Sequence, residues 1–279
     1  MSAHAKQTIQ AAVEKVGKLR QLATVTPGLA KAVSEIKALQ AKRFMGTYDD
    51  LLKTPLYQPA TQFFLEELYS ESDYSQRDAQ FSRIAGTLER MFPKQVVQTA
   101  VSLAELHSLT EELDVLMAQN WINAATNNSK NTDPIDRYIT AWHTVGRRAD
   151  RDAQLSGALA VGQELVTLTR TPGLRMALKM MRKPATLAGL AALQHFLESG
   201  FDTFAAMGPK KPSKTGQTEG PAFFLETVKK REAALIDLLF DAPEQTCKAE
   251  IDRVLSKAAY TIKIGTYPAY LLPVQLYYS

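Results

Sequence analysis

The chain has 279 residues, and its 33 lysines and arginines against 29 aspartates and glutamates give a formal net charge of +4 at pH 7. This small charge and an apolar fraction of 45% exclude a strongly charged disordered chain and support a substantial core. The 14 glycines and 13 prolines argue against low complexity, and the single cysteine excludes a disulfide framework and a cysteine-rich metal site.

The N-terminal stretch interrupts its apolar residues with charges such as Lys6, Glu14 and Lys18. A secretory signal needs an unbroken apolar run of about 7–15 residues, and a spanning helix needs about 20. The Ala-rich segment 184–196 is too short for such a helix, and prolines interrupt the uncharged segment 264–279. We therefore expect a soluble, cytoplasmic protein with no transmembrane segment.

Apolar residues recur at steps of three and four along most of the chain, which predicts helices. Thr26-Pro27-Gly28 ends the first helix, and Pro59 and Pro93 are well placed to begin two later ones. In the first half of the chain the predicted helices cover residues 9–23, 29–44, 48–52, 59–69, 76–92 and 93–121.

The polar segment 123–133 is the best internal loop and a candidate subdivision between an N-terminal and a C-terminal set of helices. Asp133 as N-cap and Pro134 in the first turn predict that a helix follows. The segment 208–220 is rich in lysine, glycine and proline, which predicts a flexible loop. The predicted helices of this half cover residues 135–145, 151–169, 171–182, 184–207, 221–239 and 244–259.

No strand-like alternation occurs before residue 258, so the predicted fold is all-α, a single bundle of about nine to eleven helices over residues 1–258. Residues 259–279 are expected to form an extended, irregular tail that holds half of the ten tyrosines. Within this tail, residues 261–264 alternate as a short strand would. Packing along the helices, binding of a partner and a junction foreign to the domain remain open for it.

Two histidines are candidate ligands for haem or a metal. His107 is followed by Glu111 and Asp114 on the same helical face, and His143 is the second candidate. A buried His107 paired with Glu111 explains the same pattern without a ligand. The Glu-x-x-His motif of di-iron bundles, the zincin motif, the phosphate loop and the hydrolase elbow are all absent from the sequence. The sequence therefore predicts no cofactor and no catalytic residue.

A basic stretch is the most informative feature of the charge pattern. Between Arg170 and Phe196 the chain has five basic residues and no acidic one. Arg175, Lys179 and Arg182 share one helical face beside an apolar stripe. Such a helix can bind an anionic membrane surface, an acidic partner or a phosphate-bearing ligand, and the alternative is a solvated face paired with acids elsewhere in the fold. The low net charge and the absence of a helix-turn-helix pattern argue against nucleic acid.

Several short motifs resemble an uncharacterised family of proteobacterial cytoplasmic helical proteins over about residues 33–240. The most specific are Phe63-Phe64-Leu65-x-x-Leu68-Tyr69 and Arg77-Asp78. The resemblance implies a bacterial source and a helical fold, and it implies no activity.

We therefore expect a non-enzymatic helical binding or protein-interaction module. Its partner would be a protein or an acidic surface reached through residues 171–182, or a small hydrophobic ligand held between helices. The alternative hypothesis is a cofactor-binding protein or enzyme with a haem or metal site near His107 or His143.

Overall fold

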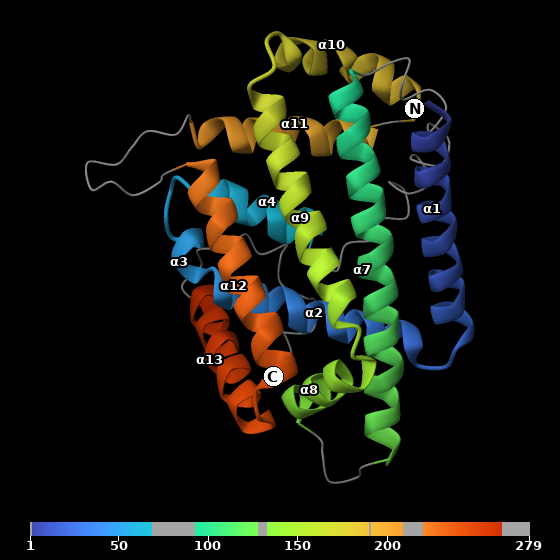
Figure 1. Cartoon of the computed structure of the whole chain (residues 1–279), viewed down its shortest axis with the longest axis vertical. Helices are drawn as coiled ribbons and strands as arrows, with labels where there is room; N and C mark the ends of the chain where they lie inside the picture. The colour runs from blue at the N-terminus through green and yellow to red at the C-terminus, as the bar shows by residue number, and fades with distance from the viewer. Residues whose placement is uncertain (1, 69–92, 128–132, 190, 209–219, 264–279) are drawn as a thin grey trace.

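The structure, a computed structural model, describes residues 2–68, 93–127, 133–189, 191–208 and 220–263. These residues form eleven helices and contain no strand, which confirms the predicted all-α fold (Figure 1). The helices, numbered as in Figure 1, are α1 (Ser2–Val25), α2 (Leu29–Thr47), α3 (Asp49–Leu52), α4 (Gln58–Leu68), α7 (Lys94–Asn127), α8 (Pro134–Val145), α9 (Arg148–Thr169), α10 (Leu174–Leu187), α11 (Ala191–Ala206), α12 (Pro221–Asp241) and α13 (Glu244–Lys263).

The long helix α7 is the axis of the bundle. It packs against α1 on one side and α9 on the other, and α12 packs against α9 in turn. The helices α2, α4, α8 and α11 run across α1, α7, α9 and α12 (Figure 1). The helix α10 lies over the upper end of the bundle, where it contacts α11 and α9. None of the described helices is both long and apolar enough to cross a membrane.

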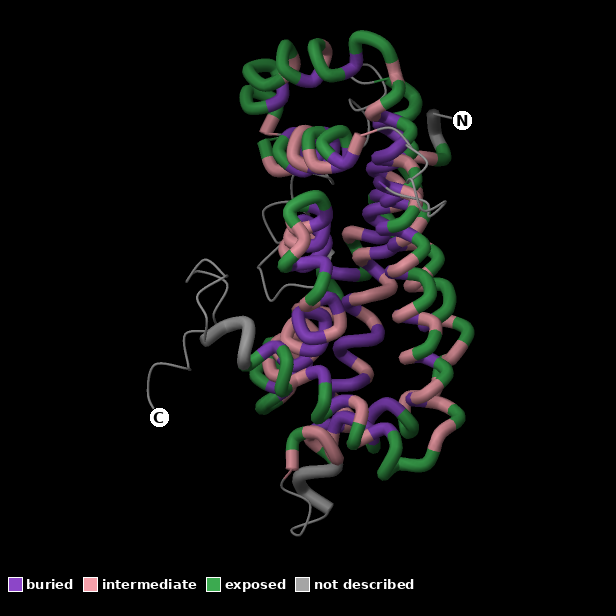
Figure 2. The backbone as a smooth tube through the Cα atoms, turned by 90° about the vertical axis from the view of Figure 1, so that its left-hand side faces the viewer, coloured by how far each residue is buried: buried purple, intermediate pink, exposed green. Residues whose placement is uncertain are grey.

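Buried residues follow the inner sides of the helices (Figure 2). Their apolar members form two clusters. The upper cluster centres on phenylalanines from α4, α11 and α12; the Phe64 and Phe224 rings, for example, meet edge to face at 5.1 Å. The lower cluster joins α2, the end of α7 and α8, and it includes Ile36, Trp121 and Trp142. Burial of these stripes is the main favourable term for the fold, as their spacing in the sequence predicts.

The predicted helix start at Pro184 is wrong, because α10 continues through this proline to Leu187. A proline inside a helix removes one backbone hydrogen bond, but continuing the helix places Ala185 in the upper cluster, where it is fully buried. The chain turns instead at Gly189, whose φ of 75° lies in the left-handed region that glycine adopts without strain.

The loop expected at 123–133 begins later than predicted, because α7 continues to Asn127. Asp133 caps α8 as predicted, since its carboxylate accepts a hydrogen bond from the Ile135 amide at 2.9 Å. The capping and first-turn proline signals therefore located the start of α8 correctly.

The C-terminal helix is longer than predicted. Because α13 continues to Lys263, the extended tail does not begin at residue 259, and a strand at 261–264 is wrong for the residues described there. Other predicted segments lie outside the described residues: the helix at 76–92, nearly all of the loop at 208–220, and the tail from 264 onward.

Candidate functional site

A layer of buried polar and charged side chains crosses the bundle between the two apolar clusters. On α2, α7 and α12, apolar residues of one cluster precede these polar positions and residues of the other cluster follow them. Burying charge is costly unless it is paired, so such a layer is a candidate functional site. The members of this polar layer are the buried Arg43, Glu111, Asp114, Arg151 and Glu232 and, beside them, the half-buried Lys37, Gln40 and Gln154.

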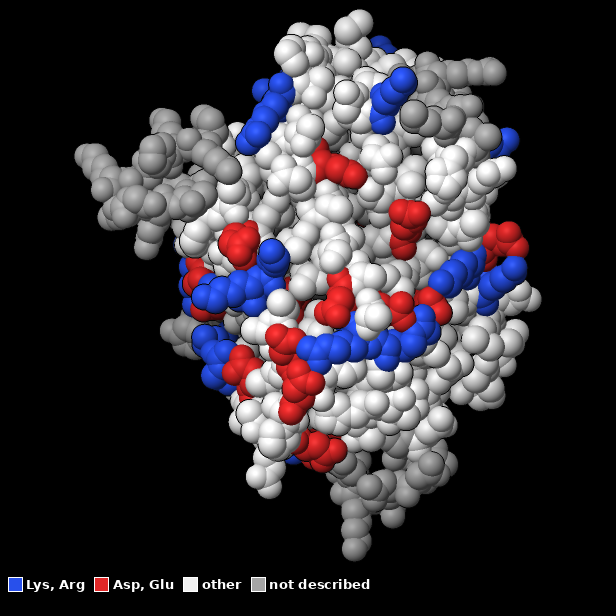
Figure 3. Space-filling view, in the orientation of Figure 1, with Lys and Arg blue, Asp and Glu red and all other residues white. Residues whose placement is uncertain are grey.

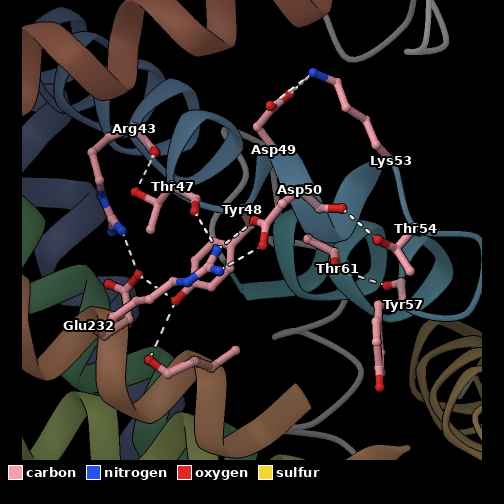
Figure 4. A network of polar contacts seen from close by, with 12 residues as sticks. Arg43, Thr47, Tyr48, Asp49, Asp50, Lys53, Thr54, Tyr57, Thr61 and Glu232 are labelled. Carbon is pink, nitrogen blue, oxygen red and sulfur yellow. Dashed lines mark hydrogen bonds and ion pairs between the residues drawn. The ribbon is translucent and has the colours of Figure 1, made fainter. Parts of the chain in front are cut away.

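One half of the polar layer is an ion pair between α2 and α12 (Figure 4). Arg43 Nη1 donates to Glu232 Oε1 at 2.6 Å, and the Tyr48 hydroxyl donates to the same oxygen at 2.9 Å. Arg43 and Glu232 are only 5% and 6% exposed, so water screens this pair very little. The pair therefore links α2 to α12 with a directional contact between buried groups.

The other half of the polar layer joins α2, α7 and α9. Lys37 Nζ donates to Glu111 Oε1 at 2.5 Å, so Glu111 is engaged by a cation on another helix. Asp114 is 1% exposed, and burial raises its pKa to about 6, although the nearby Lys37 and Arg151 oppose the rise. Asp114 is thus a buried carboxyl group that titrates near neutral pH.

Asp114 should make stability depend on pH. Its pKa of about 6 in the folded state exceeds the 3.8 expected for an exposed aspartate. The folded state therefore holds this proton more tightly, and its contribution to stability falls by about 3 kcal/mol as pH rises from about 4 to about 7. We expect Asp114→Asn to flatten this part of the curve when urea unfolding is followed at several pH values.

Asp50→Asn is the matched control, because Arg231 holds the pKa of Asp50 below its usual range. Stability from Asp50 is lost as pH falls through its folded-state pKa, which is the opposite sign. A decline between about pH 4 and 7 that persists unchanged in Asp114→Asn would show that Asp114 is not its source.

Two hollow regions adjoin the polar layer. A cavity of about 40 Å³, the layer cavity, is lined by side chains of α2, α8, α9 and α12. A side groove of about 510 Å³ runs between α3, the end of α2, the second half of α12 and the middle of α13. Charged and apolar residues share the lining of both, so neither is the predominantly apolar pocket that is typical of sites for hydrophobic small ligands.

The side groove pairs its charges across its own walls. Arg231 donates to both carboxylate oxygens of Asp50, at 2.6 and 2.7 Å, and Arg253 pairs with Glu250. These contacts leave the groove less able than the layer cavity to attract a charged ligand.

The two histidine candidates lie on different helices, and neither is part of a metal-ligating cluster of described residues. His143 Nε2 donates to the Leu239 carbonyl at 2.7 Å, which ties α8 to the end of α12, and His107 is half-buried on α7. Across the described part of the chain, no group of three or more His, Cys, Asp or Glu side chains is arranged to hold a metal ion. The alternative hypothesis of a metal or haem site near His107 or His143 is therefore not favoured.

The basic helix predicted at 171–182 corresponds to α10, and its three predicted binding residues are not equivalent. Arg175 Nε donates to Asp202 at 2.9 Å, and Arg182 forms a forked ion pair with Glu198. Lys179 is exposed and makes no ion pair with any described residue. Two of the three cations are thus partly neutralised by α11.

The outer surface of α10 also carries an apolar ridge that the sequence analysis missed. Met176, Met180 and Leu187 are 63%, 72% and 89% exposed, while Leu174 and Leu178 on the opposite face are buried. At 100° per residue the three exposed side chains lie within about 40° of one another. In the sequence, these three apolar residues form a second stripe on the face opposite the buried leucines, and this second stripe is the signal that could have predicted the ridge. We call these three residues the outer ridge of α10.

Charge is unevenly distributed around this ridge. Figure 3 shows lysine and arginine but no acidic side chain at the upper end, where Figure 1 places α10, and acidic side chains gather nearer the middle and the lower end. Lys183 lies on the same side of α10 as the ridge and, like Lys179, makes no ion pair with a described residue.

A protein-family model, described as "Domain of unknown function (DUF8198)", matches residues 19–246. The match begins within α1 and ends within α13, so it includes the polar layer and α10. No curated protein and no solved structure matches the chain.

Proposed function

The chain belongs to the DUF8198 family, a domain of unknown function, and we propose that it is a non-enzymatic binding module that docks on an anionic lipid surface through α10. The observation that carries this proposal is the outer ridge of α10 with Lys179 and Lys183 beside it. An amphipathic helix with an apolar ridge and basic flanks lies in the interface of an anionic membrane.

The packing of α10 favours a lipid surface over a protein. The inner side of α10 is held by Leu174, Leu178 and Ala185, so the helix is fixed in place without a partner. Its outer side is a ridge on a helix that lies over one end of the molecule (Figure 1). A bilayer interface accepts such a ridge directly, whereas a protein would need a matching groove.

The proposal also includes the cellular location and the extent of the domain. We place the protein in the cytoplasm of a proteobacterial cell, in keeping with the motif resemblance, where the inner leaflet presents the anionic lipids. We treat residues 1–258 as one domain, since α13 packs against α2 and so joins distant parts of the chain. Nucleic acid is not part of the proposal.

Vesicle binding tests the proposal. The full chain is expected to sediment with phosphatidylcholine vesicles that contain phosphatidylglycerol, and salt should weaken the binding because the attraction is screened. Lys179→Glu/Lys183→Glu should raise the Kd at least about tenfold, since each basic residue at an anionic bilayer contributes about 1 kcal/mol. Met176→Ser/Met180→Ser should also weaken binding but leave its salt dependence unchanged, because it removes only apolar contact.

Two matched controls accompany these variants. Lys229→Glu/Lys230→Glu reverses two exposed lysines on α12, and Val25→Ser removes an apolar side chain that is 68% exposed at the end of α1. Both controls should bind like the wild type. Two results would contradict the proposal: wild-type protein that does not bind anionic vesicles at low salt, or control variants that lose as much vesicle affinity as the α10 variants. In the first case an acidic protein surface becomes the candidate partner for α10.

A further inference from the structure

The outer ridge of α10 consists mainly of methionine. Met176 and Met180 are 63% and 72% exposed, and they lie four residues apart on one face of the helix. The opposite, buried face has leucine at the neighbouring positions, Leu174 and Leu178. Leucine and methionine are both apolar, but only the thioether of methionine is readily oxidised. The ridge therefore carries a chemical reactivity that docking on lipid does not itself require.

The other methionines of the described structure are shielded from solvent. Met45, Met117 and Met207 are 3%, 0% and 4% exposed. Met181 is half-buried and packs against the upper cluster. An oxidant dissolved in water reacts first with the sulfurs that it can touch. Such an oxidant should thus modify the two ridge methionines well before the buried ones, and the fold does not have to open for the reaction.

The reaction with hydrogen peroxide transfers one oxygen atom. The O–O bond of the peroxide breaks, one oxygen forms a bond to the methionine sulfur, and the other leaves as water. Sulfur is oxidised by two electrons, and the peroxide is reduced by two. The product, methionine sulfoxide, is polar and chiral, and sulfoxide reductases convert it back to methionine at the expense of a thiol, with one enzyme for each epimer. The modification is therefore reversible.

A sulfoxide on the ridge opposes docking on lipid. It turns a flexible apolar side chain into a polar one, and a polar group that leaves water for the acyl boundary loses its hydration. Leu187 stays apolar, and Lys179 and Lys183 keep their charge, so binding should weaken rather than disappear. The buried Leu174 and Leu178 still hold α10 on the bundle. Oxidation thus changes the docking surface while the fold is kept.

We propose that Met176 and Met180 form a reversible oxidation site for hydrogen peroxide, and that their conversion to methionine sulfoxide releases α10 from the anionic lipid surface. This inference rests on the proposed docking through α10 and adds the regulation of that same surface. The reduced chain docks on the membrane, and the oxidised chain stays free until a sulfoxide reductase restores the ridge.

Peroxide treatment of the full chain tests the inference, with peptide mass spectrometry reporting the oxidation of each methionine. Met176 and Met180 are expected to gain oxygen at least about tenfold faster than the buried methionines, without a change in circular dichroism. The oxidised chain should bind phosphatidylcholine vesicles that contain phosphatidylglycerol at least about tenfold more weakly than the untreated chain. The salt dependence should stay the same because the lysines are unchanged, and the two sulfoxide reductases together should restore the affinity.

Met176→Leu/Met180→Leu is the matched variant, because it keeps the ridge apolar but removes both sulfurs. It should bind vesicles like the wild type and keep this affinity after peroxide treatment, and since it retains Cys247 and the other methionines it also controls for their oxidation. Three results would overturn the inference: buried methionines that oxidise as fast as the ridge, an oxidised wild type that keeps its vesicle affinity, or a leucine variant that loses affinity on treatment as the wild type does. Untreated wild type that does not bind vesicles would instead contradict the proposed docking, and the inference would fall with it.

Discussion

Gly46→Ala is expected to unfold the protein, or to lower its free energy of unfolding by at least about 3 kcal/mol. Gly46 lies near the end of α2, where α13 crosses it, and a Cβ built there would lie 1.7 Å from the Val254 carbonyl oxygen. The obstacle is backbone, so no side-chain rotation relieves it, and the two helices would have to move apart. Urea unfolding followed by circular dichroism measures the loss.

Gly17→Ala is the matched control. Gly17 lies within α1, and nothing stands within 4 Å of the Cβ that alanine would add. Alanine there should raise stability by about 0.5–1 kcal/mol, because it favours the helix without any clash. If both variants gain stability, the close contact between α2 and α13 is not present in solution.

The close approach at Gly46 shows what helical periodicity cannot predict. Apolar spacing identified the inward stripes of α1, α2 and α7, because each stripe is a local pattern of three or four residues. The partner of Gly46 lies more than 200 residues away along the chain, and no local pattern encodes that distance.

The polar layer was only half visible in the sequence for the same reason. Glu111 and Asp114 stood out because they share one face with His107, but their partner Lys37 lies on another helix. Arg43 and Glu232 each occupy a position that continues the apolar stripe of its helix, which is a usable sign of burial. They are 189 positions apart in the chain, so the spacing does not show that they pair. Spacing can therefore predict that a polar residue faces inward, and only the tertiary fold shows what it meets.

The outer ridge of α10 shows a different limit. The spacing of basic residues predicts the basic face of this helix, but it does not show that α11 supplies Asp202 and Glu198 to two of its arginines. Lys179, by contrast, is exposed to solvent. The exposure of Met176 and Met180 can be recognised only once the structure shows which face of the helix is buried. A helix with two apolar stripes is ambiguous until its neighbours are placed.

Arg43→Met is expected to cost about 3–5 kcal/mol, because it leaves the Glu232 carboxylate buried without its cation. Arg253→Met is the matched control, since it breaks an exposed pair with Glu250 and should cost only about 0–1 kcal/mol. Both are measured by urea unfolding at neutral pH. A cost for Arg43→Met as small as that of the control would show that the buried pair does not form in solution.

The double variant Arg43→Met/Glu232→Gln measures the coupling between the two charges. Glutamine keeps an acceptor for the Tyr48 hydroxyl, and with both charges gone the uncompensated burial disappears. We expect it to be more stable than Arg43→Met alone, by at least about 1 kcal/mol, which would reveal the coupling of the pair. A double variant no more stable than Arg43→Met would instead assign the cost to lost packing of the arginine side chain.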